Sequence, residues 1–600
     1  MCGIAGYIGK NNAEKNLIDS LKYLEYRGYD SAGIAILKDK IDIKKSAGKI
    51  SNLEKIINYN NNSTCGIAHT RWATHGSANN VNAHPHLSNN KKWAIVHNGI
   101  IENFNQIKQD LKKQGYKFKS QTDTEVICNL LEQTNKSDPM QNVISTCNKL
   151  SGSYALCCLF ANKKDTLFLA KNKSPLFVAC NKNEVFVSSD IATFANKVDT
   201  YYSLNDNEFC CAKVNNLCFF NKNGKKISKK PNFLTNISIN NTKQNHPHFM
   251  IKEILQVPNV LKDIANLYKN NQILNKFNKE FFKKFNNIIL VGCGTAYHAS
   301  LMGAKYIEHF ARVKASANIA SEYRYNNPLI DKKTLCILVS QSGETADTLA
   351  VCNMAKENKA TTIALTNVLY STLAQICDYV LPVCAGSEIA VASTKAYTAQ
   401  ISILYMLARH MQNQLTNSNI NYLDDILSIA QESILPQPQE FEQLLNLLVK
   451  NGKKAPHTFF IGKNFDYITA LEASLKLKEI TYIFSVEHPA GELKHGFLAL
   501  IDNSAVLFAI ATNKALLEKT LNSAYEAQSR GAKIIFVTQF NLPAEVTKKF
   551  FLTVKLPNFK EELMPITSIS YFQMLAYLTS VKRGINPDQP RNLAKSVTVE

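Results

Sequence analysis

Met1-Cys-Gly-Ile-Ala-Gly-Tyr-Ile-Gly9 opens the chain and combines an expected first strand with a reactive group. The apolar residues from Gly3 to Ile8 are typical of a short buried strand. Removal of Met1 would leave Cys2 with a thiol and a free α-amine, and an amine that titrates at about pH 8 can accept the thiol proton. The stretch predicts an N-terminal nucleophile, with the alternative that Cys2 is a small buried apolar residue.

Length and composition restrict the class of protein. A chain of 600 residues exceeds what one hydrophobic core supports, so we expect several domains. The net charge of +21 comes from scattered lysines without an Arg-rich or aromatic-interleaved patch, which favours compositional drift together with an anionic small molecule over nucleic acid. No signal core and no apolar run of membrane-spanning length is found, so we expect a cytoplasmic protein without membrane contact.

The cysteines and histidines do not indicate a metal. Fifteen cysteines include no Cys-x-x-Cys pair, and two pairs are adjacent, Cys157-Cys158 and Cys210-Cys211, which is typical of reduced thiols. The histidines that could suggest a metal site are His69, His75, His84, His86 and His97. Because no carboxylate or thiol cluster accompanies them at ligand spacing, we expect ordinary hydrogen-bonded histidines and no metal.

The N-terminal part alternates short apolar runs with turn residues. Strands are predicted at Gly3–Ile8, Ser31–Ile36, Lys92–His97, Ser153–Leu159 and Glu184–Ser188, with a helix at Asp123–Leu131. We therefore expect an α+β domain of stacked sheets and covering helices at residues 2–235. Polar residues dominate residues 236–250, where we predict a linker.

Beyond the linker, strands and helices alternate twice over, as in α/β doubly wound parallel sheets. Strands are predicted at Asn287–Val291, Thr334–Val339, His457–Ile461, Ser504–Ile510 and Lys533–Val537. The repetition indicates an internal duplication, with domains at 251–445 and 446–590 and a tail at 591–600.

Polar clusters that a core does not need lie between the N-terminal strands. They are Tyr26–Ser31, His69–Gly76, Asn82–His86, His97–Asn103 and Thr122–Glu125. A thiolate that attacks a carboxamide needs donors for the oxyanion and charges that hold an α-carboxylate and an α-ammonium group. Asn98 and Gly99 can supply the donors, Arg71 the carboxylate clamp and Asp123 the ammonium partner.

With Cys2, the motifs Thr-Arg-Trp-Ala-Thr-His-Gly76 and His97-Asn-Gly-Ile-Ile-Glu-Asn resemble the class II glutamine amidotransferases, whose N-terminal cysteine hydrolyses glutamine to glutamate and ammonia. The resemblance implies an Ntn-type fold, Cys2 as nucleophile, an oxyanion hole at Asn98 and Gly99, and a mobile gate of Trp72 and the Tyr26–Ser31 loop. The implied glutamine contacts are Arg71, Trp72, Thr74, His75, Gly99 and Asp123. Lys173 departs from the family, which usually has Gly before the Ser-Pro-Leu of residues 174–176.

A second motif, Leu335-Cys-Ile-Leu-Val-Ser-Gln-Ser-Gly-Glu-Thr-Ala-Asp-Thr348, runs from an apolar strand into a hydroxyl-rich turn and a helix. Ser340, Ser342 and Thr345 would surround a helix N-terminus, which attracts a phosphate monoester. Capping the helix needs only one hydroxyl, so three indicate a ligand. The stretch at 292–298 lacks the last glycine and the acidic partner of a dinucleotide site, so we expect no cofactor.

Lys476 and Glu479 lie three residues apart and hence on one helix face, a spacing that alone usually means a surface ion pair. An aldose–ketose isomerisation needs a proton-shuttling base, a group that opens the sugar ring, and an amine for a Schiff base. The second half resembles the sugar isomerase (SIS) domains. The segment Ala385–Ala396 and the amidotransferase half narrow the family further. The whole chain, from Cys2 to Glu600, resembles the isomerizing aminotransferases that use glutamine and fructose 6-phosphate.

This resemblance implies the products D-glucosamine 6-phosphate and L-glutamate, ammonia channelled between the sites, and the first step of UDP-N-acetylglucosamine biosynthesis. It gives Glu479 the role of the base, assisted by Lys476, His495 the opening of the ring, and Lys595 the Schiff base. It also implies a homodimer in which His495 serves the partner's site. The implied sugar-phosphate contacts are Thr295, Ser340, Gln341, Ser342, Thr345, Val391 and Ser393. Ala296, Phe484 and Phe497 replace a Ser, a His and a Pro that are frequent in the family.

Two other functions remain open. Another class II amidotransferase, either phosphoribosyl or asparagine-forming, would need a pyrophosphate-binding or ATP-binding segment, and the sequence has neither a Ser-Gly-Gly loop nor an acidic phosphoribosyl motif. A sugar-phosphate sensor would keep only the fold. The presence of Cys2, Glu479, His495 and Lys595 argues against a sensor.

Overall fold

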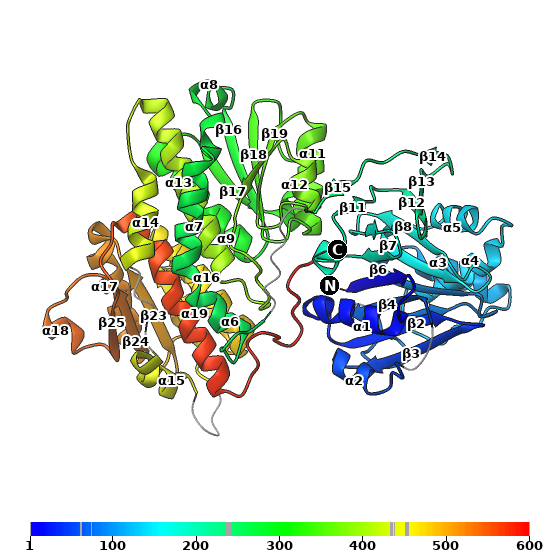
Figure 1. The fold of residues 1–600 in the computed structure, drawn as a ribbon. Coiled ribbons are helices and arrows are strands. Elements are labelled where there is room, and N and C mark those ends of the chain that lie inside the picture. The colour runs from blue at the N-terminus through cyan, green and yellow to red at the C-terminus, as the bar shows by residue number, and fades with distance from the viewer. Residues whose placement is uncertain are drawn as a thin grey trace. The chain divides into compact units, whose positions relative to one another are not determined.

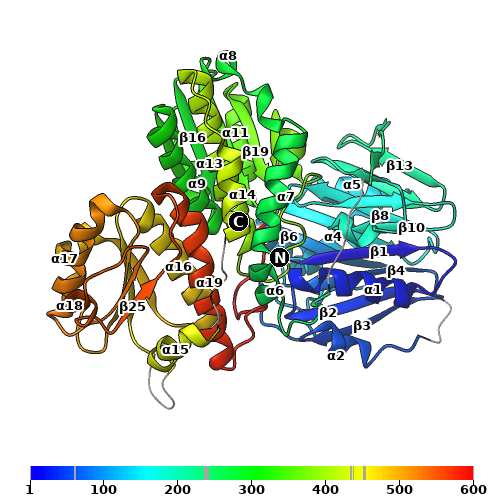
Figure 2. The ribbon, with the colours of Figure 1, turned by 60° about the vertical axis from the view of Figure 1, so that its left-hand side comes forward.

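The computed structural model describes residues 2–59, 63–73, 75–234, 242–432, 436, 438–449 and 455–598. The chain divides into two compact units, Met1–Asn241 with Ala594–Glu600, and Thr242–Leu593, whose elements are labelled in Figures 1 and 2. Part of the predicted linker, residues 236–241, lies outside the described residues, and helix α6 (Phe249–Leu255) begins within its last two residues.

The described part of the first unit contains two antiparallel sheets. One has the strand order β15-β11-β9-β10-β1-β4-β2-β3 and the other β14-β13-β12-β8-β7-β6-β5. The strands are β1 (Gly3–Ile8), β2 (Ser31–Leu37), β3 (Ile41–Ala47), β4 (Cys65–Arg71), β5 (His86–Leu87), β6 (Trp93–Ile101), β7 (Gly152–Phe160), β8 (Leu167–Asn172), β9 (Phe177–Cys180), β10 (Val185–Ser188), β11 (Thr200–Ser203), β12 (Glu208–Lys213), β13 (Asn216–Phe220), β14 (Lys226–Ile227) and β15 (Asn232–Phe233). The helices are α1 (Ala13–Leu24), α2 (Ile50–Glu54), α3 (Phe104–Lys113), α4 (Glu125–Thr134) and α5 (Pro139–Cys147).

Strand β6 explains the layering of this unit. Ala94 and Val96 belong to the core between the two sheets, whereas Trp93 and Ile95 belong to a second core that includes residues of α3, α4 and α5. Successive side chains of a strand point to opposite faces, so a strand buried on both faces is apolar throughout. The predicted stacked-sheet α+β domain is therefore confirmed.

The adjacent cysteines follow the same rule. Cys157 packs in the core between the sheets and Cys158 in the core beneath the helices. Neighbours on a strand point apart, so the two sulfurs face different layers. All fifteen cysteines are free thiols, as predicted.

The second unit contains two parallel sheets in its described residues, ordered β17-β16-β18-β19-β20 and β22-β21-β23-β24-β25. The strands are β16 (Asn287–Gly292), β17 (Ala315–Ile319), β18 (Thr334–Ser340), β19 (Thr361–Thr366), β20 (Tyr379–Pro382), β21 (Thr458–Gly462), β22 (Ser485–Pro489), β23 (Val506–Ala511), β24 (Lys533–Thr538) and β25 (Leu552–Lys555). The helices after α6 are α7 (Val257–Asn270), α8 (Lys279–Phe282), α9 (Thr295–Tyr306), α10 (Ala320–Tyr323), α11 (Ala346–Glu357), α12 (Thr372–Ile376), α13 (Lys395–Thr416), α14 (Tyr422–Glu432), α15 (Glu442–Leu448), α16 (Phe465–Thr481), α17 (Leu517–Gln528), α18 (Ala544–Thr547) and α19 (Met564–Lys582). The shared strand order confirms the predicted duplication of a doubly wound fold.

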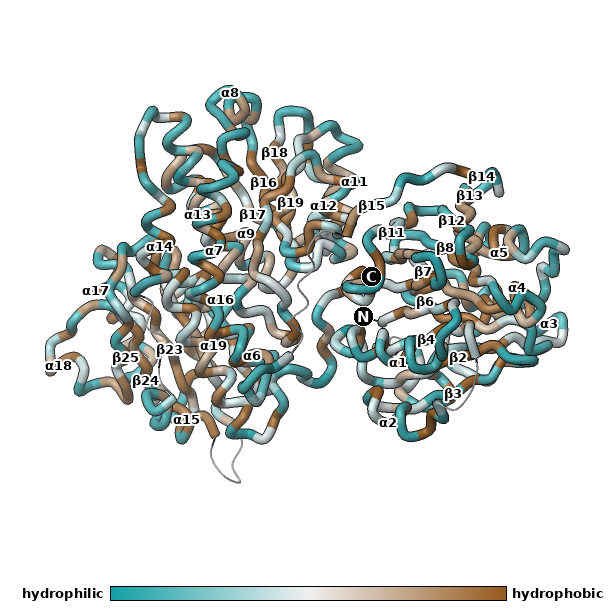
Figure 3. Tube along the Cα trace, viewed as in Figure 1, coloured by the Kyte–Doolittle hydropathy of each residue, from teal (hydrophilic) through white to brown (hydrophobic). Residues whose placement is uncertain are grey.

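One predicted strand starts too early. Ser504 was expected to begin a strand, but β23 begins at Val506 because the backbone N–H and the hydroxyl of Ser504 both donate to Asp502 Oδ1, which holds a turn. The strongly apolar strands β16, β18 and β19 appear as brown segments in Figure 3. The bounds of β16 and β18 agree with the predicted ones to within one residue, whereas β19 was not predicted.

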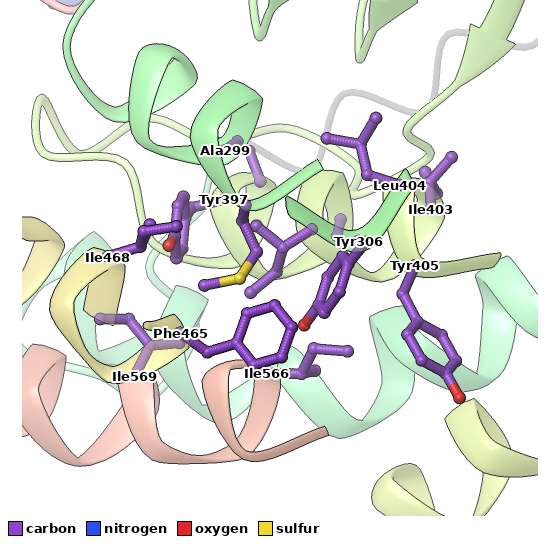
Figure 4. Packing of buried hydrophobic residues seen from close by; sticks show 14 of the residues in the cluster. Ala299, Tyr306, Tyr397, Ile403, Leu404, Tyr405, Phe465, Ile468, Ile566 and Ile569 are labelled. Atoms are coloured by element: carbon purple, nitrogen blue, oxygen red, sulfur yellow. The ribbon is translucent and has the colours of Figure 1, made fainter. Parts of the chain in front are cut away.

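The two parallel-sheet domains share one hydrophobic core. Figure 4 shows Tyr306 of α9, Tyr405 of α13, Phe465 of α16 and Ile569 of α19 packed together, and all four belong to one buried cluster. The rings of Tyr306 and Phe465 lie 5.3 Å apart. The duplicated domains are thus joined by packing between their helices. None of the described helices is both long and apolar enough to cross a membrane.

Candidate active sites in the two units

Cys2 lies directly before β1, where pairing with β4 places it beside the end of that strand. Gly3 pairs with Thr70, and the backbone N–H of Trp72 donates to Cys2 Sγ at 3.3 Å. Burial raises the pKa of the Cys2 thiol, while the bond from Trp72 and the charge of Arg71 act in the opposite direction. A thiol in this environment needs an adjacent base to become a nucleophile.

Asn98 and Gly99 come from β6 of the other sheet. Asn98 Nδ2 donates to the backbone oxygen of Cys2 at 3.0 Å. Gly99 has φ +135°, and a Cβ there would lie 2.0 Å from the Ser153 carbonyl oxygen, so no other residue fits without moving β7. The structure therefore brings Asn98, one of the two predicted oxyanion donors, into contact with the predicted nucleophile.

Arg71 is held by the turn that follows β4. It is 3% exposed and donates to the carbonyl oxygens of His75, Gly76 at 3.2 Å and Ser77 at 3.3 Å. These partners are neutral, so they orient the guanidinium without cancelling its charge. Asp123 is fixed from the opposite side, because its Oδ2 accepts the N–H of Ile101 at 2.8 Å. Thr74 lies outside the described residues.

The two segments of the predicted gate touch each other. The rings of Tyr29 and Trp72 meet edge to face at 5.5 Å, and the N–H of Ala73 donates to Asp30 Oδ2 at 2.8 Å. The start of the loop is anchored by a buried ion pair in which Arg27 Nη2 lies 3.1 Å from Asp190 Oδ2. Sequence reasoning did not single out Asp190, because its partner lies 163 positions away.

Four of the five histidines form a buried stack beneath this site. His69, His84, His86 and His97 are each at most 4% exposed, and the rings of His69 and His84 stack at 4.2 Å. Hydrogen bonds to His69, His86 and His97 confirm the expected ordinary histidines. Within the described part of the chain, no group of three or more His, Cys, Asp or Glu side chains is arranged to hold a metal ion.

In the second unit, Ser340 ends β18 and begins the loop that leads into α11. Ser340 Oγ accepts the N–H of Gly343 at 3.0 Å and lies 3.0 Å from Thr345 Oγ1. Thr345 is the N-cap residue of α11, yet its side chain makes no capping bond. The hydroxyl groups thus lie at a helix N-terminus, and Thr345 at the N-cap makes no capping bond. A helix N-terminus with such hydroxyl groups is suited to bind an anion.

The turn that precedes α9 lies beside this loop. Strands β16 and β18 are neighbours in the sheet, and the order of strands reverses between them, which is where ligands bind in doubly wound folds. Thr295 is the first residue of α9, after Gly294 with φ +54°. The predicted Val391 and Ser393 lie in a separate loop, in which Ser393 Oγ donates to Glu388 Oε2 at 3.0 Å.

Lys476 is buried on α16 and pairs with the half-buried Glu479, whereas their spacing alone suggests a surface pair. Lys476 is 1% exposed, and its Nζ lies 2.6 Å from Glu479 Oε2 and 3.0 Å from Thr295 Oγ1. Burial alone would lower the pKa of Lys476, but the carboxylates of Glu472 and Glu479 outweigh it and raise that pKa. The ammonium ion therefore connects the turn before α9 with the predicted proton-shuttling carboxylate.

Sequence reasoning missed two members of this network, Glu472 and His298. Glu472 is fully buried, accepts a bond from Thr295 at 3.1 Å, and its Oε2 lies 2.7 Å from His298 Nδ1. The spacing of Glu472 and Lys476, four residues apart, was the signal that could have identified Glu472. His298 had no such signal, because α9 and α16 come together only in the folded chain.

The two remaining predicted residues, His495 and Lys595, lie outside α9 and α16. His495 is exposed at the end of a short 3₁₀ segment, Ala490–His495. Lys595 lies in the segment Ala594–Glu600, which belongs to the first compact unit, whereas Glu479 belongs to the second. Phe484 is 62% exposed, as a surface residue of its domain.

Comparisons with known proteins define the class first. Residues 69–196 match the family model of the glutamine amidotransferase domain, and residues 281–409 and 453–583 each match that of the SIS domain. The chain is therefore a glutamine amidotransferase joined to two SIS domains.

Relatives of the whole chain are more specific. It is 41% identical over 616 residues to the glutamine–fructose-6-phosphate aminotransferase (isomerizing) of Clostridium tetani and 39% identical over 610 residues to that of Thermococcus kodakarensis, with 100% of each chain covered. A solved C-terminal domain of glucosamine-fructose-6-phosphate aminotransferase from Francisella tularensis matches with TM-score 0.54 and 32% identity over 58% of this chain and 99% of that one. The chain belongs to the family of isomerizing glutamine–fructose-6-phosphate aminotransferases.

Proposed function

We propose that the chain converts D-fructose 6-phosphate and L-glutamine to D-glucosamine 6-phosphate and L-glutamate, the first step towards UDP-N-acetylglucosamine. The observation that carries the proposal is that one chain of this family bonds the Asn98 amide to the backbone oxygen of Cys2, the predicted nucleophile, and pairs the buried Lys476 with Glu479 and Thr295. The hydroxyl-rich N-terminus of α11 belongs to the same unit as that pair. A protein that only hydrolysed glutamine, or only isomerised a sugar phosphate, would not need both sites.

At the first site, Met1 is removed and the α-amine of Cys2 takes the thiol proton. The thiolate attacks the glutamine carboxamide, and Asn98 and Gly99 stabilise the oxyanion. Ammonia leaves, and water hydrolyses the thioester to glutamate. Arg71 holds the α-carboxylate and Asp123 the α-ammonium group, with Trp72, Thr74 and His75 completing the glutamine pocket.

At the second site, Ser340, Gln341, Ser342 and Thr345 bind the phosphate, while Thr295, Val391 and Ser393 contact the sugar. His495 opens the ring, and Lys595 forms a Schiff base at C2 that ammonia replaces with loss of the lysine. Glu479, assisted by Lys476, then moves a proton from C1 to C2, which yields the amino aldose.

The proposal includes the organisation of the protein. Residues 2–235, 251–445 and 446–590 are the three domains, and residues 591–600 form a tail that serves the sugar site. The active form is a cytoplasmic homodimer in which His495 acts in the partner's site. Ammonia passes from the first site to the second past Trp72, without release into water.

Two variants test the division of labour. Cys2→Ala should abolish release of glutamate from glutamine but leave isomerisation of fructose 6-phosphate to glucose 6-phosphate, which we expect the second site to perform without glutamine. Glu479→Gln should remove isomerisation and leave glutamate release. If Glu479→Gln still forms glucosamine 6-phosphate at the wild-type rate, the proposed base is wrong.

A further inference from the structure

The amide of Asn98 can help at Cys2 only in one of its two orientations. A carboxamide has nearly the same shape when its oxygen and nitrogen are exchanged, so its neighbours must decide which end faces the thiol. Asn98 Nδ2 donates to the Cys2 carbonyl at 3.0 Å, and its second N–H has no partner among the described residues. The second N–H is therefore available for an oxyanion.

His69 lies on the opposite side of this amide. Its Nε2 is 2.9 Å from the carbonyl oxygen of His97 and 3.1 Å from Asn98 Oδ1. A backbone carbonyl only accepts, so Nε2 must carry the hydrogen and donate to both oxygens. If the Asn98 amide were reversed, its N–H groups would face the N–H of His69 and its oxygen would face the carbonyl oxygen of Cys2. Neither contact could be a hydrogen bond.

We propose that His69 is a positioning residue for glutamine hydrolysis, which holds the Asn98 amide with its N–H groups toward Cys2. The inference rests on the proposed reaction at Cys2 and adds to it the group that orients the oxyanion donor. His69 itself touches neither the thiol nor, through any described contact, the substrate pocket. Its effect on the reaction therefore passes through Asn98, whose side chain and preceding carbonyl it holds.

The surroundings of His69 keep its ring in this tautomer. The side chain is fully buried, and Nδ1 has no hydrogen-bond partner in the described part of the chain. Its ring stacks on that of His84 at 4.2 Å, and the described hydrogen bonds of His69 include no carboxylate. Burial lowers the pKa of His69 to about 3, so the imidazole stays neutral through the physiological range.

The test compares glutamine hydrolysis in four variants of the full chain. His69→Met removes the donor at similar volume, and we expect kcat to fall about 100-fold with KM for glutamine within about threefold, because the lost interaction acts in the transition state. His69→Gln returns an N–H near the position of Nε2 and should recover most of kcat. The double variant His69→Met/Asn98→Ala should be no slower than Asn98→Ala alone, since His69 acts through Asn98.

His86→Met is the matched control. His86 belongs to the same buried stack but bonds Thr122 Oγ1 at 3.0 Å and not Asn98, so its loss should change kcat less than about threefold. Tryptophan emission checks that the first unit of each variant is folded, since Trp72 and Trp93 both belong to that unit. A wild-type kcat in His69→Met, an equal loss in His86→Met, or losses that multiply in the double variant would overturn the inference.

A spectroscopic measurement avoids dependence on any variant. The ¹⁵N chemical shifts of His69 in the wild-type chain, assigned with His69→Gln, should report a neutral ring with the hydrogen on Nε2. A protonated ring, or a hydrogen on Nδ1, would contradict the inference. If the wild-type chain released no glutamate at all, the proposed function would fail while the tautomer could still be as inferred.

Discussion

Single residues control the first site through backbone geometry as much as through side-chain chemistry. Gly99 lies at φ +135° against the Ser153 carbonyl, and Cys2 accepts the Trp72 N–H at the end of β4. These backbone contacts restrict the positions of the nucleophile and of the predicted oxyanion donors. A displacement of about 1 Å is sufficient to reduce transition-state stabilisation.

Substitution Gly99→Ala tests this requirement. The added Cβ would lie 2.0 Å from the Ser153 oxygen, so β6 must shift and carry Asn98 with it. We expect kcat for glutamine hydrolysis to fall about 100-fold while fructose 6-phosphate isomerisation is retained. Steady-state release of glutamate measures the change, and unaltered hydrolysis would show that Asn98 is not placed by this glycine.

Lys173 is the departure from the family pattern that the structure explains. It adopts φ +63°, where a glycine has no steric cost, and its N–H donates to Asp206 Oδ1 at 2.7 Å. Lys173→Gly should keep that bond and remove the strain, raising the free energy of unfolding by about 1 kcal/mol. Urea denaturation followed by tryptophan emission measures it, and a lower midpoint would contradict the explanation.

At the scale of elements, both sites form where strands end. The loop between β18 and α11 is kept tight by Gly343 at φ +64°, where a Cβ would lie 2.0 Å from Ser371 Oγ. Glu344 supports the same loop from behind, because its Oε1 accepts the N–H of Thr372 at 2.7 Å. The start of α12 thus contacts and supports the proposed phosphate loop.

The substitution Gly343→Ala should open this loop. Because one phosphate hydrogen bond is lost or lengthened, we expect KM for fructose 6-phosphate to rise about tenfold. Glutamine hydrolysis takes place in the other unit and serves as the internal control. An unchanged KM would mean that the phosphate is bound elsewhere.

The histidine stack makes the first unit sensitive to acid. Unfolded histidine binds a proton below pH 6.5, whereas burial lowers the pKa of folded His69 to about 3 and those of His84, His86 and His97 below the ordinary value. Stability is therefore lost as the pH falls below about 6.5, and for His69 the loss is roughly 1 kcal/mol per pH unit down to about pH 3. Both tryptophans, Trp72 and Trp93, report on this unit. A urea midpoint independent of pH between 7 and 5 would contradict this expectation.

The strands were predictable because the burial of each strand is reflected in the apolar residues of its own segment. Strand β1 matches its predicted bounds, and β16 and β18 each end one residue beyond theirs, since a chain buried on both faces must be apolar throughout. The ends of elements were less certain, as Ser504 shows, because a single side-chain bond decides them. The Asp190 and His298 contacts were not predictable, since no local pattern specifies a partner more than 150 positions away.

At the scale of the whole molecule, the duplicated parallel-sheet domains are one structural unit and the antiparallel sheets another. The core shared by α9, α13, α16 and α19 joins the duplicated domains, and the Lys476 network connects two of these helices, from Thr295 of α9 to Glu479 of α16. Motifs indicated which residues carry the chemistry. They could not indicate that Glu472, buried at the centre, holds Thr295, His298 and Lys476 together.

The central claim is that nitrogen passes from the glutamine amide to the sugar within this chain. The most direct measurement supplies amide-¹⁵N glutamine and fructose 6-phosphate together with excess unlabelled ammonium, and determines the isotope in the product by mass spectrometry. We expect glucosamine 6-phosphate that carries ¹⁵N in nearly every molecule. Product whose nitrogen matches the unlabelled ammonium pool would contradict internal transfer.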